Sequence, residues 1–112
     1  MKVTLFLSLV IFSNLSYANG SSIIELPTPE FKAAINVING KCITCHAVWE
    51  YYSSADFVNA GYVVAKSPEQ SSIYYRNSNA KVGPGPRNMP SSGFPQLNDS
   101  ELNDMLVWIN SL

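Results

Sequence analysis

The two cysteines and the single histidine of this chain stand together as Cys42-Ile43-Thr44-Cys45-His46, and this cluster constrains the fold more than any other feature. They are the only thiol and imidazole side chains among the 112 residues, so any metal or redox chemistry must be built largely from them. A chain of this length forms one domain, since domains usually contain roughly 100–200 residues. The sequence therefore predicts a single small domain organised around one short segment.

Cysteines at positions i and i+3 lie on one side of a helical turn, so both thiols can reach the edge of the same flat ligand. The next residue, His46, projects its imidazole beneath the centre of that ligand. This geometry suits covalent bonding to both vinyl groups of a haem with ligation of its iron, and C-x-x-C-H is the signature of c-type haem attachment. We therefore expect one covalently bound haem c, held by Cys42, Cys45 and His46.

Three other interpretations of the cluster stay open. A thioredoxin-like C-x-x-C motif belongs in a βαβ context, which the sequence does not show. A structural zinc site needs four protein ligands, and these three residues leave it one short unless a carboxylate completes it. A plain disulfide between Cys42 and Cys45 would close a very short loop and would gain little chain entropy.

Charge and composition exclude several classes of protein. Seven basic and eight acidic residues give a net charge of −1, without the excess of Lys and Arg that phosphate binding needs. The hydrophobic fraction of 46% argues against disorder. We therefore expect a globular domain that binds no nucleic acid.

Residues 1–18 have the pattern of a secretory signal peptide. Lys2 precedes the apolar run Val3–Phe12, and Ser16-Tyr17-Ala18 has small residues at the two positions that signal peptidase reads. The run is too short for a membrane-spanning helix, which needs about 20 residues. We expect a periplasmic protein whose mature domain, residues 19–112, is not an integral membrane protein; an uncleaved anchor or a buried helix is the alternative.

Two amphipathic patterns predict helices near the ends of this mature domain. Thr28 is a good N-cap with Pro29 at the first helical position, and Gly40 is a candidate C-cap. Asn98 and Glu101 form a capping-box pair that begins the other helix, where apolar residues recur with helical spacing.

The sequence between these two helices is less regular. Ser67–Asn77 predicts a short helix that begins with an N-cap Ser and a Pro. Tyr62–Ala65 has a weak strand pattern. Val82–Pro95 holds four of the seven Pro and three of the six Gly, which predicts a stiff, extended loop carrying Met89.

Met89 is the expected sixth ligand of a haem iron. His46 is the only histidine, so two histidine ligands cannot come from one chain. A thioether is a soft donor suited to haem iron, and Pro90 restricts the backbone that would hold it. The alternative role of a Met, filling a gap in the core, fits Met105 on the apolar face of the last helix better.

The order of these features resembles a class I, single-haem c-type cytochrome over roughly Pro29–Leu112. The resemblance implies an all-α cytochrome c fold, with three to four short helices and loops wrapped around one covalent haem. It implies that Cys42 and Cys45 form the thioethers, that His46 is the proximal ligand and that Met89 is the distal ligand. It also implies that the first and last helices pack, through contact positions that match Ala34, Ile38 and Trp108.

The sequence departs from this family after the histidine. A Gly-Pro pair often follows there, and its Pro carbonyl orients the imidazole, but Ala47–Ala60 contains neither residue type. The acceptor for the His46 ring N–H is thus undefined. We expect Trp49-Glu50-Tyr51-Tyr52 to cover the haem edge or to form a docking patch. The candidate partners of the haem propionates are Trp49, Tyr74, Tyr75, Arg76 and Arg87.

The resemblance implies an electron carrier rather than an enzyme, with iron that cycles between Fe(III) and Fe(II) under His46/Met89 ligation. Its partners would be redox proteins, and the near-neutral charge predicts docking that depends weakly on salt. We expect a monomer. The alternatives are a haem enzyme or gas sensor with an open or labile sixth position, or a haem subunit of a larger respiratory complex.

Overall fold

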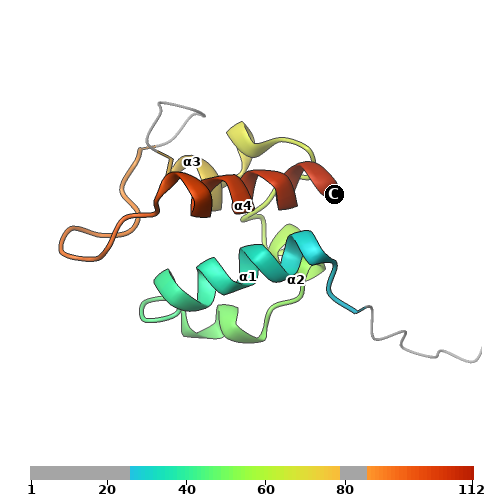
Figure 1. Cartoon of the computed structure of the whole chain (residues 1–112), viewed down its shortest axis with the longest axis horizontal. Helices are drawn as coiled ribbons and strands as arrows, with labels where there is room; N and C mark the ends of the chain where they lie inside the picture. Colours follow the sequence, from blue (N-terminus) through green and yellow to red (C-terminus); the bar gives the residue numbers. More distant parts are fainter. Residues whose placement is uncertain (1–25, 79–85) are drawn as a thin grey trace, which may run out of the picture.

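The computed structural model describes residues 26–78 and 86–112, and its regular elements over these ranges are all helical (Figure 1). The predicted all-α class is confirmed. The expected signal peptide at residues 1–18 and the beginning of the predicted Pro/Gly loop lie outside the described residues. The elements are α1 (Pro29–Lys41), the 3-10 helix η1 (Ala47–Tyr51), α2 (Ser54–Asn59), the 3-10 helix η2 (Pro68–Gln70), α3 (Ser72–Tyr75) and α4 (Asp99–Ser111).

Helices α1 and α4 pack against each other and supply most of the core (Figure 1). Ala34 and Ile38 of α1 are fully buried, as are Trp108 and Ile109 of α4. A small residue such as Ala34 lets a neighbouring element approach α1 closely, while the large side chains fill the remaining space. The expected packing of the first helix on the last is therefore confirmed.

Both long helices begin where the sequence predicts. The Thr28 hydroxyl accepts a hydrogen bond from the backbone N–H of Phe31 at 3.2 Å. At α4 the capping box is complete in both directions, with 2.9 Å from the Glu101 N–H to Asn98 Oδ1 and 2.9 Å from the Asn98 N–H to Glu101 Oε2. The predicted end of α1 at Gly40 is wrong, because the helix continues to Lys41 and is capped by Cys42.

The middle of the chain differs most from the sequence prediction. The helix predicted at Ser67–Asn77 is divided into η2 and α3 at Ser71, which is extended and fully buried. The Ser71 hydroxyl donates to the carbonyl of Ser67 at 2.8 Å and accepts from the N–H of Val64 at 2.9 Å. These side-chain bonds compete with a continuous helix. The strand pattern at Tyr62–Ala65 is also wrong, since no strand forms in the described ranges.

Helices η1 and α2 lie in a region where no helix is predicted from the sequence pattern. The signal for α2 is a capping box in which the N–H of Asp56 donates to the Ser53 hydroxyl and the N–H of Ser53 donates to the Asp56 carboxylate. Phe57 of α2 is fully buried and contacts four aromatic rings, of Phe31, Trp49, Tyr52 and Trp108. This aromatic cluster connects the α1–α4 core to η1.

Candidate functional site

The cysteine–histidine cluster forms a tight turn that directly continues α1. The Cys42 N–H donates to the carbonyl of Ile38 at 2.8 Å, as the cap of that helix. The N–H groups of Cys45 and His46 both donate to the Cys42 carbonyl, at 3.2 and 2.9 Å, and the Trp49 N–H donates to the His46 carbonyl at 2.9 Å. The cluster is thus a hydrogen-bonded turn between α1 and η1, and its backbone is fixed by the helices on both sides.

The two thiols of this turn differ in environment. Cys42 is half-buried, Cys45 is exposed, and both are free. Burial raises the pKa of the Cys42 thiol to about 11, and the negative charges of Cys45 and Glu101 add to the shift. Cys42 is therefore a protonated thiol at neutral pH, whereas Cys45 is the accessible member of the pair.

The alternative metal and disulfide chemistries find little support in this turn. Nowhere in the described ranges do three His, Cys, Asp or Glu side chains converge on a point where they could hold a metal ion. Cys42, Cys45 and His46 therefore do not form an incipient tetrahedral site. The cysteines are not joined in a disulfide.

Met89 is brought to the same place as this turn. Two cavities, of about 40 and about 250 Å³, lie between the turn and the loop that contains Met89. Cys42 and Cys45 line the smaller one, and four residues line both: His46, Trp49, Asn77 and Met89. The structure therefore brings together all four residues that the sequence singles out, although Met89 is far from the other three in the sequence.

The backbone around Met89 is tied to the end of α3. The N–H of Met89 donates to the carbonyl of Arg76 at 3.0 Å, and the Arg76 guanidinium donates to Asn88 Oδ1 at 3.4 Å. Arg87 Nε donates to the carbonyl of Ser78. These bonds hold the part of the loop that precedes and includes Met89 against the end of α3.

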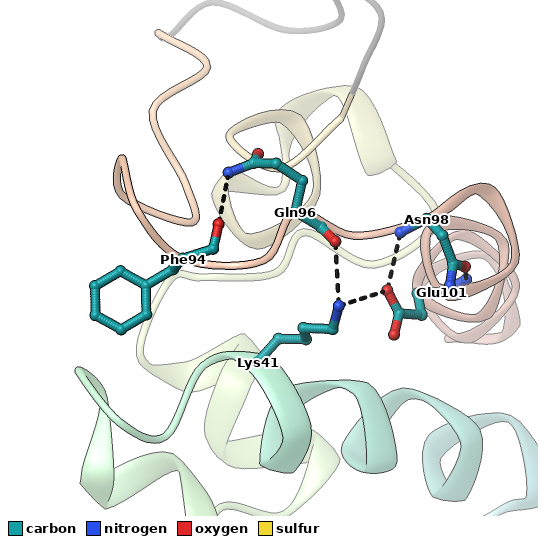
Figure 2. A network of polar contacts seen from close by, with 5 residues as sticks. All are labelled: Lys41, Phe94, Gln96, Asn98 and Glu101. Atoms are coloured by element: carbon teal, nitrogen blue, oxygen red, sulfur yellow. Dashed lines mark hydrogen bonds and ion pairs between the residues drawn. The ribbon is translucent and has the colours of Figure 1, made fainter.

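A second set of bonds ties the far side of the loop to α1 and α4 (Figure 2). Gln96 Nε2 donates to the carbonyls of Pro90 and Phe94, at 3.1 and 3.4 Å. The Gln96 carbonyl accepts from Lys41 Nζ at 3.1 Å, and Lys41 Nζ lies 3.5 Å from the Glu101 carboxylate. Lys41 is the last residue of α1, immediately before Cys42. The cysteine turn and the Met89 loop are therefore connected through one lysine.

The aromatic residues of the segment Trp49–Tyr52 differ in burial. Trp49 is only 6% exposed and belongs to the core, whereas Tyr51 is 81% exposed. Trp49 lines both cavities, so it is the residue of this segment that could cover a haem edge, while Tyr51 is the one exposed for the docking alternative. The indole of Trp49 also lies flat against the imidazole of His46, a contact that the sequence did not predict.

The candidate propionate partners are only partly gathered at the cavities. Arg76 lines the larger cavity and Trp49 lines both. Tyr74, Tyr75 and Arg87 line neither of them. The structure thus separates these five candidates into two that adjoin the site and three that do not.

The side chains at this site are of the chemical types that a covalently bound haem requires. Two free thiols, an imidazole and a thioether line a region whose other walls include the apolar side chains of Trp49, Pro90 and Phe94. The larger cavity lies just below the roughly 300–1,000 Å³ typical of ligand pockets. A macrocycle would therefore require the Met89 loop to move outward. The bonds that tie this loop down are mostly exposed side-chain bonds, each of which contributes only about 0.5–1.5 kcal/mol.

Comparisons with protein-family models, with curated protein sequences and with solved structures gave no match. Within the described residues, no helix is long and apolar enough to cross a membrane.

Proposed function

We propose that this chain is a periplasmic c-type cytochrome with one haem, and that it transfers electrons between redox proteins. The observation that carries the proposal is the position of Met89, whose side chain lines the same two cavities as His46. An imidazole and a thioether form the axial pair that raises the reduction potential of a haem. The two residues come from opposite halves of the fold, so their convergence is not a by-product of sequence proximity.

Each residue of the site has a distinct role in this proposal. Cys42 and Cys45 would hold the haem through two thioether bonds, and His46 and Met89 would ligate its iron. When bound, the haem iron supplies one-electron chemistry between Fe(III) and Fe(II). The chain contributes the ligands, their orientation and an apolar lining that keeps water away.

The same ligand set favours a carrier over an enzyme. If His46 and Met89 both ligated the iron, no coordination site would be left for a substrate or a gas. The α1–α4 core and the aromatic cluster around Phe57 hold the cysteine turn in place, and this support does not depend on the Met89 loop. Little rearrangement of the turn is then needed when the charge of the site changes, which suits rapid electron transfer.

Arg76 is the best-supported partner for a haem propionate. It lines the larger cavity, and its bond to Asn88 is long, at 3.4 Å, so the guanidinium is free to change partner. Arginine also binds carboxylates in a bidentate manner. The cytochrome c fold itself is supported by the packing of α1 on α4 and by the position of the Met89 loop opposite the cysteine turn.

Heterologous export together with a haem-attachment system tests the proposal directly. We expect the purified protein to retain haem on a denaturing gel and to give the pyridine haemochrome spectrum of two thioether bonds. The double variant Cys42→Ser/Cys45→Ser should lose both signals. A wild-type protein without covalent haem would contradict the proposal.

Visible spectroscopy separates the carrier from the enzyme or sensor. A ferric protein with a six-coordinate, low-spin haem and a sulfur-to-iron charge-transfer band supports electron transfer, and Met89→Ala should abolish that band. Met105→Ala is the matched control, because Met105 is buried in the core and lines neither cavity. A high-spin ferric haem that readily binds added ligands would support the alternative instead.

A further inference from the structure

The imidazole of His46 is oriented by a ring face and not by a hydrogen bond. Its centroid lies 4.0 Å from that of the Trp49 ring, and the two planes are 10° from parallel. Neither ring nitrogen of His46 forms a hydrogen bond with any described residue. The turn that follows His46 thus offers a flat aromatic surface where a carbonyl acceptor would be expected.

Trp49 is itself fixed by the core. Its ring makes edge contacts with Tyr62 at 4.9 Å and with Phe57 at 5.5 Å between centroids. Phe57 is fully buried and contacts Trp108 of α4 at 5.5 Å. Close-packed aromatic rings allow little rotation, so the position of the Trp49 ring follows that of the α1–α4 core.

Stacking is compatible with metal ligation. The lone pair of a neutral imidazole and its N–H both lie in the plane of the ring, and a partner on the ring face blocks neither of them. Trp49 can therefore restrict rotation of the imidazole while its nitrogens stay available. Ring orientation and ligand basicity are the two properties that a hydrogen-bonding partner of a ligating His normally controls.

We propose that Trp49 is the positioning residue for the axial imidazole of His46, and that it orients this ring by stacking in place of a hydrogen-bond acceptor. The inference rests on the proposed function, because it assigns a role toward a haem ligand. It also predicts an electronic effect. An imidazole whose N–H lacks an acceptor donates less charge to iron, which favours the ferrous form and a raised potential.

Three holoprotein variants test this role. Trp49→Leu removes the stacked ring, Trp49→Phe keeps a smaller one, and Tyr52→Leu is the control. Tyr52 packs on Phe57 at 5.0 Å in the same cluster, but its ring does not stack on His46. The readouts are the g values of the ferric low-spin haem by electron paramagnetic resonance, the paramagnetically shifted haem methyl signals by NMR, and the midpoint potential.

We expect Trp49→Leu to change the spread of the haem methyl shifts and to broaden the g-value distribution, because the imidazole is no longer held in one orientation. The midpoint potential should fall as water reaches the proximal side. Trp49→Phe should restore most of the wild-type pattern, and Tyr52→Leu should leave it unchanged despite a loss of stability. A Trp49→Leu holoprotein with wild-type g values and methyl shifts would overturn the role of Trp49 and leave the proposed function intact. A wild-type protein that takes up no haem would overturn both.

Discussion

Lys41 Nζ lies 3.1 Å from the backbone carbonyl oxygen of Gln96, and this contact links the end of α1 to the loop that carries Met89 (Figure 2). The side chain of the same Gln96 donates to the carbonyls of Pro90 and Phe94. Gln96 therefore closes the loop on itself while its own backbone is held by the helix that precedes Cys42. This arrangement makes Gln96 the residue whose removal should loosen the loop most selectively.

Gln96→Ala should weaken retention of Met89 more than it weakens the fold. Two exposed hydrogen bonds are lost, at roughly 0.5–1.5 kcal/mol each, and no core contact changes. In the haem-loaded protein that the proposed function implies, the sulfur-to-iron band should disappear at a lower urea concentration than in wild type, while the loss of helical circular dichroism shifts less. Gln70→Ala, in an exposed residue of η2, is the control. Equal shifts of both transitions would argue that Gln96 supports the whole domain and not the loop.

The thiols should react at different rates in protein prepared without haem. The thiolate is the nucleophile in alkylation, and with a pKa of about 11 only about one Cys42 thiol in 1,000 is ionised at pH 8. Iodoacetamide should therefore label Cys45 first at pH 8, and the rate at Cys42 should rise with each pH step toward 11. Mass spectrometry of peptides from Cys42→Ser and Cys45→Ser proteins assigns each rate. Faster labelling of Cys42 at pH 8 would contradict the buried environment described here.

The capping box of α2 should make stability depend on acid pH. The N–H and hydroxyl of Ser53 both donate to the Asp56 carboxylate and hold its pKa below the usual value. Because the folded pKa is the lower one, the cap stabilises the protein above the unfolded pKa, near 4, and is lost as pH falls through the folded pKa.

Asp56→Asn should therefore lower the thermal midpoint at pH 6 and change it much less near pH 3. Asp104→Asn alters the charge equally without touching a cap, so it reports the effect of charge alone. If the two variants have the same pH profile, the cap does not contribute.

Ala34→Leu should be strongly destabilising. Ala34 is fully buried in the core that α1 shares with α4, so the added carbons must displace one of the helices. Overpacking of this kind costs roughly 1–3 kcal/mol of unfolding free energy. Ala33→Leu makes the same substitution at the adjacent half-buried position and should cost less. Urea denaturation of both proteins measures the difference, and equal midpoints would show that this part of the helix pair is loosely packed.

The features that sequence predicted well are local ones. The N-caps at Thr28 and Asn98 depend on residues three positions away, so the pattern contains the information that determines them. The break at Ser71 was missed because the serine bonds to Val64 as well as to its own turn. Whether a serine side chain competes with the helix depends on what the fold places beside it.

The sequence predicts which residues form the candidate site, but it does not predict the contacts that hold them in place. Cys42, Cys45, His46 and Met89 could be selected from the sequence because their chemistry is scarce in this chain. The contact of Lys41 with Gln96 spans 55 residues, and the stack of Trp49 on His46 depends on side-chain rotamers that packing decides. No periodicity or composition encodes either of these contacts.

The half-buried Cys42 at the end of α1 has a consequence for biogenesis. Its thiol is a weak nucleophile once α1 and α4 have closed on each other, and the turn that carries it is already hydrogen-bonded on both sides. If the chain takes up haem as proposed, attachment at Cys42 must therefore precede folding, while this segment is still extended. A chain that folds first and meets haem afterwards should be modified at Cys45 alone, and the order of maturation is thus built into one helix terminus.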